Sequence, residues 1–454
     1  MSHTDARRCA HAALVAVERA ARQATLARIQ DRLDLGAVVP KDRGLALELA
    51  LGTERMHLLL DRVLEAFVER ELPREAEVLC ALRLGAYQLL FLTRVPAHAA
   101  VHETVGLAGH ARGFVNAVLR RVSSSIVTRA ADPERITREL ALSAGEDGCQ
   151  RALQLPEDVL PDPAKDPDAA MALVHGLPAF LVTRWRQRWD AATAESIAKA
   201  ASAQPEVFLR VRSELGAEEL TEELARAGSE VVPTEDAAIV RVVGGRSPFE
   251  SESFQRGDFV AQDPTALAAV RALGTQADES VLDLCAAPGT KTTFLAECVG
   301  MGGRVIAYDS DPARLRRVRE NLRRLGLEQV EVHEEIPRGE AFDRVLVDAP
   351  CSNTGVLLRR VEVRRRISPE SIARLSALQK GLLASACQLV KPGGHVLYST
   401  CSLEREENES VVATALERGA VLVAERTTLP EVGRHDGGYW ALLKRGMRDQ
   451  PSPP

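Results

Sequence analysis

The chain has 454 residues, of which 45% are hydrophobic, so it can form two or three domains that each bury a core. This composition excludes a disordered protein. The formal net charge of −6 argues against a surface that binds nucleic acid throughout, because phosphate binding requires a cationic face.

The eight cysteines are scattered, without the paired spacing of a zinc site or a disulfide framework. We therefore expect no metal, reduced thiols and a cytoplasmic location. Residues 1–8 are polar and predict no secretory signal. The longest apolar runs, such as 86–92, are shorter than the roughly 20 residues that cross a bilayer, so we expect no membrane partner.

The first part of the chain is predicted to be helical. Apolar residues recur at helical spacing over 6–125, with breaks at Pro40 and Pro96, which predicts a helical domain over 1–130. Prolines and glycines then become frequent, so residues 131–175 are predicted to be a linker with some helix.

A small α+β subdomain is predicted over residues 176–250. The segment 180–189 is expected to be a helix, and a second helix is expected at 217–227, between strands at 207–212 and 238–243.

The C-terminal half alternates between strands and helices. Apolar strands in turn with helices predict a parallel sheet that is covered on both faces, so residues 251–446 are expected to form a doubly wound, Rossmann-like α/β domain. Residues 447–454 are expected to be a disordered tail. The expected strands are 281–284, 304–308, 342–347 and 395–399, and the expected helices are 292–299, 313–325 and 369–389.

The first of these strands leads into a turn that suits a cofactor. In an open parallel sheet the ligand lies beyond the carboxyl ends of the strands. Gly289 permits a close approach of the backbone, and the following helix offers free amides. An ordinary tight turn explains a single glycine equally well. Because the turn lacks the glycine patterns of dinucleotide and P-loop sites, NAD and ATP are disfavoured.

Acidic residues after the first two strands favour S-adenosylmethionine. Asp309 ends the second strand, where a carboxylate can accept hydrogen bonds from ribose hydroxyls. Asp311 precedes Pro312 and a helix, and is expected to be an N-cap. Because a sulfonium tolerates nearby negative charge, S-adenosylmethionine is the predicted cofactor.

Two cysteines follow strands of the same sheet, Cys351 after Asp348-Ala349-Pro350 and Cys401 after Ser399-Thr400. Either cysteine alone is explained equally well as a partly buried small residue. Together they indicate that a thiolate adds to carbon 6 of cytosine, so that carbon 5 can attack a methyl sulfonium. Asp348 is expected to hydrogen-bond the base, or else to cap loop amides. Lys291 is expected to lower the pKa of a thiol or to hold the cofactor's carboxylate, or else to be a solvated lysine.

A basic run follows the first of these cysteines. Residues 359–380 contain seven basic residues and two acidic ones. Such a run is usually a solvated face, but its place after a thiol loop makes it a candidate RNA contact. The arginines concerned are Arg359, Arg360, Arg364, Arg365 and Arg366.

Three motifs resemble those of the RsmB/Sun family of ribosomal RNA cytosine-5 methyltransferases: 283–291, 348–352, and 398–402 with Glu406-Glu407-Asn408 after it. The resemblance implies that Cys401 is the nucleophile and that Cys351 assists release. It further implies that S-adenosylmethionine contacts Cys285, Ala286, Ala287, Pro288, Gly289, Thr290, Lys291, Asp309, Glu334 and Asp348.

The resemblance extends to the helical domain. Segments 82–90, 94–96 and 113–121 are similar to the NusB-like RNA-binding domain of RsmB, which implies a 16S ribosomal RNA target rather than transfer RNA. Residues 176–250 are likewise expected to bind RNA, residues 436–440 look like the family's closing strand, and a monomer is expected.

The chain departs from the family's pattern at four places. Thr290 stands where a second glycine is usual, and Asn353 stands after Cys351 where the family prefers a small residue. Glu334 replaces an aspartate near the adenine. The segment 359–363 replaces an arginine pair followed by His-Pro-acid, so contacts with the target RNA are expected to differ.

The sequence therefore predicts an S-adenosylmethionine-dependent enzyme that forms 5-methylcytosine in 16S ribosomal RNA through a covalent cysteine adduct. A transfer RNA cytosine-5 methyltransferase is one alternative. An inactive RNA-binding ribosome assembly factor is the other, because a fold does not fix a function.

Overall fold

The computed structural model describes residues 5–23, 28–212, 216–337 and 339–446, so the predicted tail at 447–454 lies outside the described residues. The chain divides into two compact units. Unit 1 comprises Met1–Ala203 and Leu357–Arg366, and unit 2 comprises Gln204–Val356 and Ile367–Pro454.

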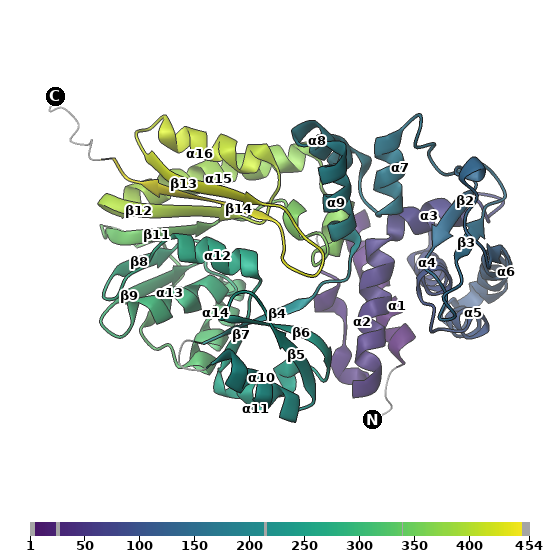
Figure 1. Ribbon diagram of the computed structural model, residues 1–454, viewed down its shortest axis with the longest axis horizontal. Helices are drawn as coiled ribbons and strands as arrows, with labels where there is room; N and C mark the ends of the chain where they lie inside the picture. Colours follow the sequence, from purple (N-terminus) through teal and green to yellow (C-terminus); the bar gives the residue numbers. More distant parts are fainter. Residues whose placement is uncertain (1–4, 24–27, 213–215, 338, 447–454) are drawn as a thin grey trace. The chain divides into compact units, whose positions relative to one another are not determined.

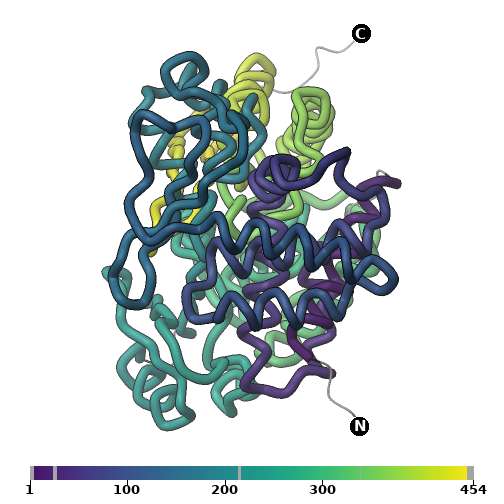
Figure 2. The backbone as a smooth tube through the Cα atoms, turned by 90° about the vertical axis from the view of Figure 1, so that its right-hand side faces the viewer, coloured from purple at the N-terminus to yellow at the C-terminus, as the bar shows by residue number. Residues whose placement is uncertain are grey.

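Unit 1 begins with a helical bundle, as predicted, whose helices are coloured purple to blue in Figures 1 and 2. Its central helix is α4, in which almost every residue is buried, including the polar residues Arg83 and Gln88. A helix that is apolar nearly all round can only be stable inside a bundle. The helices are α1 (Ala6–Arg22), α2 (Arg43–Arg55), α3 (His57–Glu65), α4 (Ala76–Phe91), α5 (Ala97–Val105) and α6 (Arg112–Ser124).

The segment predicted as a linker with some helix contains the helix α7 (Pro167–Val174) and also a small sheet that the sequence did not predict. Strands β1 (Ile126–Val127), β2 (Glu139–Leu142) and β3 (Arg151–Gln154) pair antiparallel in the order β1-β3-β2. Strands of two to four residues are too short for an alternating pattern to be recognised among prolines and glycines. Helices α7 (Pro167–Val174), α8 (Ala179–Arg188) and α9 (Ala191–Ser202) follow, and α8 matches the helix predicted at 180–189.

Unit 2 begins with a four-stranded antiparallel sheet in the order β5-β6-β4-β7. The predicted strands and helix correspond to β4 (Val207–Val211), α10 (Ala217–Arg226) and β6 (Ile239–Gly245). The sequence analysis missed two short strands. The remaining elements are β5 (Ser229–Pro233), α11 (Glu252–Arg256) and β7 (Phe259–Ala261).

The second sheet of unit 2 has seven strands in the order β10-β9-β8-β11-β12-β14-β13. It is parallel as predicted except for β14, which pairs antiparallel with both neighbours, so the sheet is mixed. The chain order reverses between β8 and β11, where a crevice for a ligand is expected. The strands are β8 (Ser280–Asp283), β9 (Arg304–Tyr308), β10 (Val330–His333), β11 (Phe342–Asp348), β12 (Val390–Thr400), β13 (Val421–Thr428) and β14 (Gly438–Lys444).

Helices cover both faces of this sheet, as the apolar strands predicted (Figure 1). Neighbouring residues of β8 belong to different cores: Val281 packs with residues of three helices on one side, and Leu282 packs with residues of two helices on the other. This alternation is the two-residue period of a strand. The first side is covered by α12 (Pro264–Ala272), α13 (Thr290–Val299) and α14 (Pro312–Leu325), and the second by α15 (Pro369–Leu389) and α16 (Glu409–Leu416).

Two local features lie near the carboxyl ends of β8 and β9, where the cofactor is predicted to bind. Gly289 precedes α13 with φ at 100°, a left-handed conformation that glycine adopts without steric cost, and an added Cβ would lie 3.3 Å from Val318. Asp311 caps α14 with its carboxylate, which accepts from the Ala313 amide, and Pro312 occupies the first turn. The predicted N-cap is therefore confirmed.

Candidate functional site

The two cysteines predicted to do chemistry lie together. β11 and β12 are parallel neighbours in which Asp348 lies opposite Ser399, so the loops after them run side by side. The Sγ atoms of Cys351 and Cys401 are 3.2 Å apart. Two thiols at this distance can exchange a proton directly.

The two thiols have different surroundings. Cys351 is 7% exposed, and its hydrogen bond with Cys401, together with burial, raises its pKa well above the usual value for a thiol. Cys401 is half-buried. Cys351 therefore stays protonated at neutral pH, and Cys401 is the more accessible of the two sulfurs.

A buried carboxylate ties the two thiol loops to each other. Glu407 has no exposed surface and accepts hydrogen bonds from the Ser352 amide at 2.9 Å, from the Ser352 hydroxyl, and from the Ser402 hydroxyl at 2.5 Å. Burial raises its pKa, and these hydrogen bonds oppose that rise. Because Ser352 follows Cys351 and Ser402 follows Cys401, one side chain fixes the position of both loops. The sequence analysis named Glu407 only as part of a motif.

Asn353 contacts both cysteines and was noted in the sequence only as a departure from a small residue. Its φ of 63° lies in the left-handed region, which favours glycine and tolerates asparagine. Its Nδ2 donates to the carbonyl oxygen of Cys351 at 2.7 Å, and its Oδ1 accepts from Cys401 Sγ at 3.2 Å. The position therefore excludes bulky or β-branched side chains but not asparagine.

A cavity of about 220 Å³ lies at the carboxyl end of β8, where the cofactor was predicted. Six of the seven residues of the predicted loop line it, and Gly289 does not. The loop residues that line it are Cys285, Ala286, Ala287, Pro288, Thr290 and Lys291, and they are joined by Ala261, Gln262, Asp263, Ala266, Asp283 and Asp348.

Two buried polar atoms in this cavity have no hydrogen-bond partner within the described chain: Asp283 Oδ1 and Gln262 Nε2. The Asp283 side chain is held by Thr292, whose hydroxyl donates to Oδ2 at 2.7 Å. The Gln262 side chain is held by Arg210, whose Nε donates to Oε1 at 2.7 Å. Both residues were missed as site residues, because a buried orphan atom is visible only in a folded chain. One acceptor and one donor are therefore available to a ligand.

Acidic side chains surround the loop 285–291. Burial raises the pKa of Asp283 to about 7, with a further rise from Asp348 that Thr292, Lys291 and the Cys285 amide oppose. Burial and the nearby carboxylates of Asp283, Asp348 and Asp309 raise the pKa of Cys285, so this thiol stays protonated. Such an environment suits a cationic group.

Lys291 forms an ion pair with Asp348, and both side chains line the cavity. Asp348 also accepts from the Ser399 hydroxyl at 2.9 Å. The structure thus places Lys291 against a carboxylate rather than against either of the paired thiols. Its expected contact with a cofactor carboxylate stays a prediction.

The two other acids predicted to contact the cofactor have protein partners. Asp309 follows β9 and is 2% exposed; it accepts from the Asp311 amide at 3.1 Å and pairs with Arg314 at 3.1 Å. Glu334 follows β10, has a side chain that is 55% exposed, and pairs with Arg319 at 3.2 Å. Contacts of Asp309 with ribose and of Glu334 with adenine stay predictions.

The arginine run packs within unit 1. Arg364 is 3% exposed and donates to three carbonyl oxygens, those of Gly176 at 3.0 Å, Leu357 at 2.7 Å and Ala201 at 2.6 Å. Arg365 pairs with the buried carboxylates Glu54 and Glu18. Arginines that satisfy buried protein acceptors cannot also bind phosphate.

We therefore propose RNA contact for neither Arg364 nor Arg365. In sequence both looked like part of a charged surface, because burial of an arginine by distant acceptors leaves no local pattern. Arg360 pairs with Glu362 at 2.8 Å and is half-buried, as is Arg359, whereas Arg366 is exposed. For these three the RNA contact stays a prediction.

A groove of about 690 Å³ between α5 and α6 is lined by basic side chains. Its lining includes Arg112, Arg120, His98 and His102, all of which are exposed. None of the described residues that line the groove is acidic. This groove is the more cationic candidate surface of unit 1.

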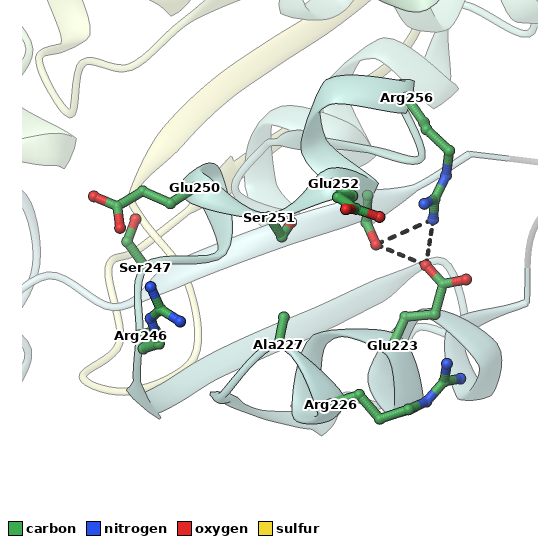
Figure 3. Close-up of a pocket in the computed structure, with 10 residues that line it drawn as sticks. Glu223, Arg226, Ala227, Arg246, Ser247, Glu250, Ser251, Glu252 and Arg256 are labelled. Atoms are coloured by element: carbon green, nitrogen blue, oxygen red, sulfur yellow. Dashed lines mark hydrogen bonds and ion pairs between the residues drawn. The ribbon is translucent and has the colours of Figure 1, made fainter.

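A hollow of about 410 Å³ lies beside the small sheet of unit 2 (Figure 3). Arg256 there pairs with Glu223 and with Asp258. Equal numbers of positive and negative side chains favour neither a phosphate nor a cation, so we assign no ligand to it. The charged residues lining it are Arg226, Arg246, Arg256, Glu223, Glu250 and Glu252.

Across the described ranges, no cluster of three or more histidine, cysteine, aspartate or glutamate side chains is arranged to hold a metal ion. Helices long and apolar enough to span a membrane are likewise absent from the part of the chain that the structure describes.

Three family comparisons match successive parts of the chain. Residues 4–124 match the NusB family, residues 177–242 match the ferredoxin-like domain of RsmF/B-like methyltransferases, and residues 270–441 match 16S rRNA methyltransferase RsmB/F. The last match contains the cavity loop and both cysteines of the close pair.

Individual relatives extend over nearly the whole length. Ribosomal RNA small subunit methyltransferase B of Proteus mirabilis is 31% identical, covering 92% of this chain and 96% of its own. The protein of the same name from Pseudomonas syringae is 32% identical, covering 92% of each chain. A crystal structure of a methyltransferase homolog protein from Pyrococcus horikoshii aligns with a TM-score of 0.55 at 27% identity, covering 63% of this chain and 100% of that one.

Proposed function

Because the chain belongs to the 16S rRNA methyltransferase RsmB/F family, we propose that it methylates carbon 5 of a cytosine in 16S ribosomal RNA, with S-adenosylmethionine as the methyl donor and Cys401 as the nucleophile. The observation that carries the proposal is the close pair of Cys351 and Cys401, 3.2 Å apart, which lie three residues after the end of β11 and one residue after the end of β12. One of these ends, Asp348, lines the cavity. Cysteines with a purely structural role would have no reason to lie side by side next to this cavity.

The residues of the cavity fit S-adenosylmethionine. Asp283 Oδ1 would accept a hydrogen bond from a cationic group of the cofactor, and Gln262 Nε2 would donate one to an acceptor of the cofactor. These are the two atoms that lack protein partners. Amides at the start of α13 are available to a carboxylate. When bound, S-adenosylmethionine supplies an electrophilic methyl group on its sulfonium.

Replacing Asp283 with asparagine is expected to weaken S-adenosylmethionine binding by about 10- to 100-fold, the range for a lost hydrogen bond to a charged group. Affinity of the wild-type protein is also expected to fall as pH drops below about 7, because protonation of Asp283 removes the negative charge that faces the ligand. Calorimetry measures both effects. Asp311→Asn, at the cap of α14, is the control, and equal affinity of Asp283→Asn and wild type would refute the assignment.

The side chains of the site divide the work on the RNA base. The Cys401 thiolate attacks carbon 6 of the cytosine, which makes carbon 5 nucleophilic. Asp348 hydrogen-bonds the base and stabilises the charge that develops on it. Carbon 5 then takes up the methyl group, and its proton is lost to solvent as the bond between Cys401 and carbon 6 breaks. The Cys351 thiol, which contacts the Cys401 sulfur, protonates the departing sulfur and regains a proton from solvent. Glu407 keeps the two loops at the distance this exchange requires.

We further propose that the groove between α5 and α6 contacts the RNA backbone. Replacing Arg112 and Arg120 together with alanine is expected to reduce the slope of log affinity against log salt by about 1.4 to 1.8, since each lost phosphate contact removes about 0.7 to 0.9. Filter binding to 16S rRNA at several salt concentrations measures this slope. Replacing Arg226, in the hollow with balanced charge, with alanine is the control. An unchanged slope in the double variant would place the RNA elsewhere.

The reaction itself is tested by incubating the protein with labelled S-adenosylmethionine and rRNA from cells that lack the enzyme. We expect label in 5-methylcytidine of 16S rRNA, consistent with the names of the relatives, and none in transfer RNA. Label in transfer RNA, or in another nucleoside, would contradict the proposal. RNA binding without any methyl transfer would favour the assembly factor instead.

A further inference from the structure

We propose that Asn353 is a further catalytic residue, whose side-chain amide holds the proton of Cys401 in the resting site and so controls how readily this thiol ionises. This rests on the proposed function, in which Cys401 is the nucleophile. The proposal starts from one side chain that hydrogen-bonds to both cysteine residues.

The orientation of the Asn353 amide follows from its two partners. The carbonyl oxygen of Cys351 can only accept, so the NH2 group of the amide must face it, at 2.7 Å. The amide oxygen then faces Cys401 Sγ, at 3.2 Å. An oxygen accepts the proton of a thiol but repels a thiolate. Asn353 therefore stabilises only the protonated form of Cys401.

The direction of the contact between the sulfurs follows as well. A thiol carries a single proton. Because Cys401 donates its proton to Asn353, Cys351 is the donor across the 3.2 Å between the two sulfurs. The raised pKa of Cys351 agrees with a thiol that keeps its proton. When Cys401 loses its proton to solvent, it keeps the contact with Cys351 and loses the one with Asn353.

The backbone conformation at this position accepts both replacements, and each of them removes the hydrogen bond that Asn353 Nδ2 donates to the Cys351 carbonyl oxygen. With φ at 63°, glycine is fully compatible and aspartate is well tolerated. Asn353→Gly removes the amide. Asn353→Asp keeps the size of the side chain and places a charged oxygen near Cys401. Asn353→Gly therefore removes the acceptor of the Cys401 proton, whereas Asn353→Asp replaces it with a charged acceptor.

The experiment measures how fast iodoacetamide alkylates Cys401 in the full-length protein at a series of pH values. The protein is first reduced and then transferred to buffer without reductant. Neither RNA nor S-adenosylmethionine is added. Mass spectrometry of peptides distinguishes Cys401 from the other cysteines, and exposed Cys149 serves as the internal reference. In Asn353→Gly we expect the pH midpoint for Cys401 to move down and alkylation at neutral pH to be about two- to fivefold faster, as befits one weak hydrogen bond. In Asn353→Asp we expect the midpoint to move up.

A loop that is merely loosened would raise the alkylation rate at every pH without moving the midpoint. An unchanged midpoint in Asn353→Gly, or the same direction of change in both variants, would overturn the proposal. Because no substrate is present, the outcome is independent of the overall reaction. If the midpoints move as expected but RNA is trapped on Cys351, the role of Asn353 toward Cys401 holds and the assignment of the nucleophile fails.

Discussion

Replacing Cys401 with alanine is expected to abolish the covalent adduct with RNA that contains 5-fluorocytosine and to lower methyl transfer by at least about 10³-fold, as loss of a nucleophile does in other enzymes. Fluorine at carbon 5 cannot leave as a proton does, so an enzyme that attacks carbon 6 stays attached to its substrate. A denaturing gel with labelled RNA shows the adduct as a shifted band. We expect this band in the wild type and not in Cys401→Ala.

Cys351→Ala is expected to behave in the opposite way. Without the thiol that contacts the Cys401 sulfur, attack still occurs but release is slow, so adduct should accumulate even on RNA with ordinary cytosine. Cys387→Ala, on α15, is the matched control and should release its product at the wild-type rate. If Cys401→Ala still forms the adduct and Cys351→Ala does not, the two roles are reversed.

Replacing Arg365 with methionine is expected to lower the free energy of unfolding of unit 1 by about 3 to 5 kcal/mol, the range for removing one member of a buried ion pair. Arg365 donates to Glu54 at 2.8 Å and to Glu18 at 2.8 Å, and both carboxylates are buried. Arg83 still pairs with Glu18 in the variant, so Glu54 carries most of the loss. Urea unfolding followed by tryptophan fluorescence reports on unit 1 through Trp185 and Trp189, and on unit 2 through Trp440.

Arg366→Met is the matched control, since it makes the same change one residue later at an exposed position. Its effect is expected to stay within about 0.5 kcal/mol. The smaller part of the Arg365→Met deficit, which comes from Glu18, should shrink in acid. Burial alone would raise the pKa of Glu18, but Arg83 and Arg365 lower it to about 2 from the usual 4.5, so their contribution is complete above pH 4.5 and is lost as pH falls toward 2. Equal stability of the two variants at neutral pH would contradict the network.

The sequence was sufficient to predict those features of the structure that depend on interactions between residues close together in the chain. The two-residue alternation of strands, the 3.6-residue period of helices and the cap formed by Asp311 and Pro312 act over a few residues, and the structure confirms them. The same holds for the four predicted strands that became β8, β9, β11 and β12, because parallel strands connected by helices place every loop after a strand at one edge. That is why Cys351 and Cys401 could be expected at the same place, although 50 residues separate them.

The tertiary structure alone decided which polar groups are shared between distant segments. β14 is antiparallel because its place depends on pairing with β12 and β13 rather than on its own residues. Arg364 and Arg365 read as surface charges in the sequence and are satisfied by acceptors far along the chain. The Asn353 amide and the Glu407 carboxylate became site residues only once two loops were brought into hydrogen-bond range. Local preferences therefore determined the elements and the edge that carries the thiols, whereas burial and the need to pair every buried polar group decided what each side chain there can do.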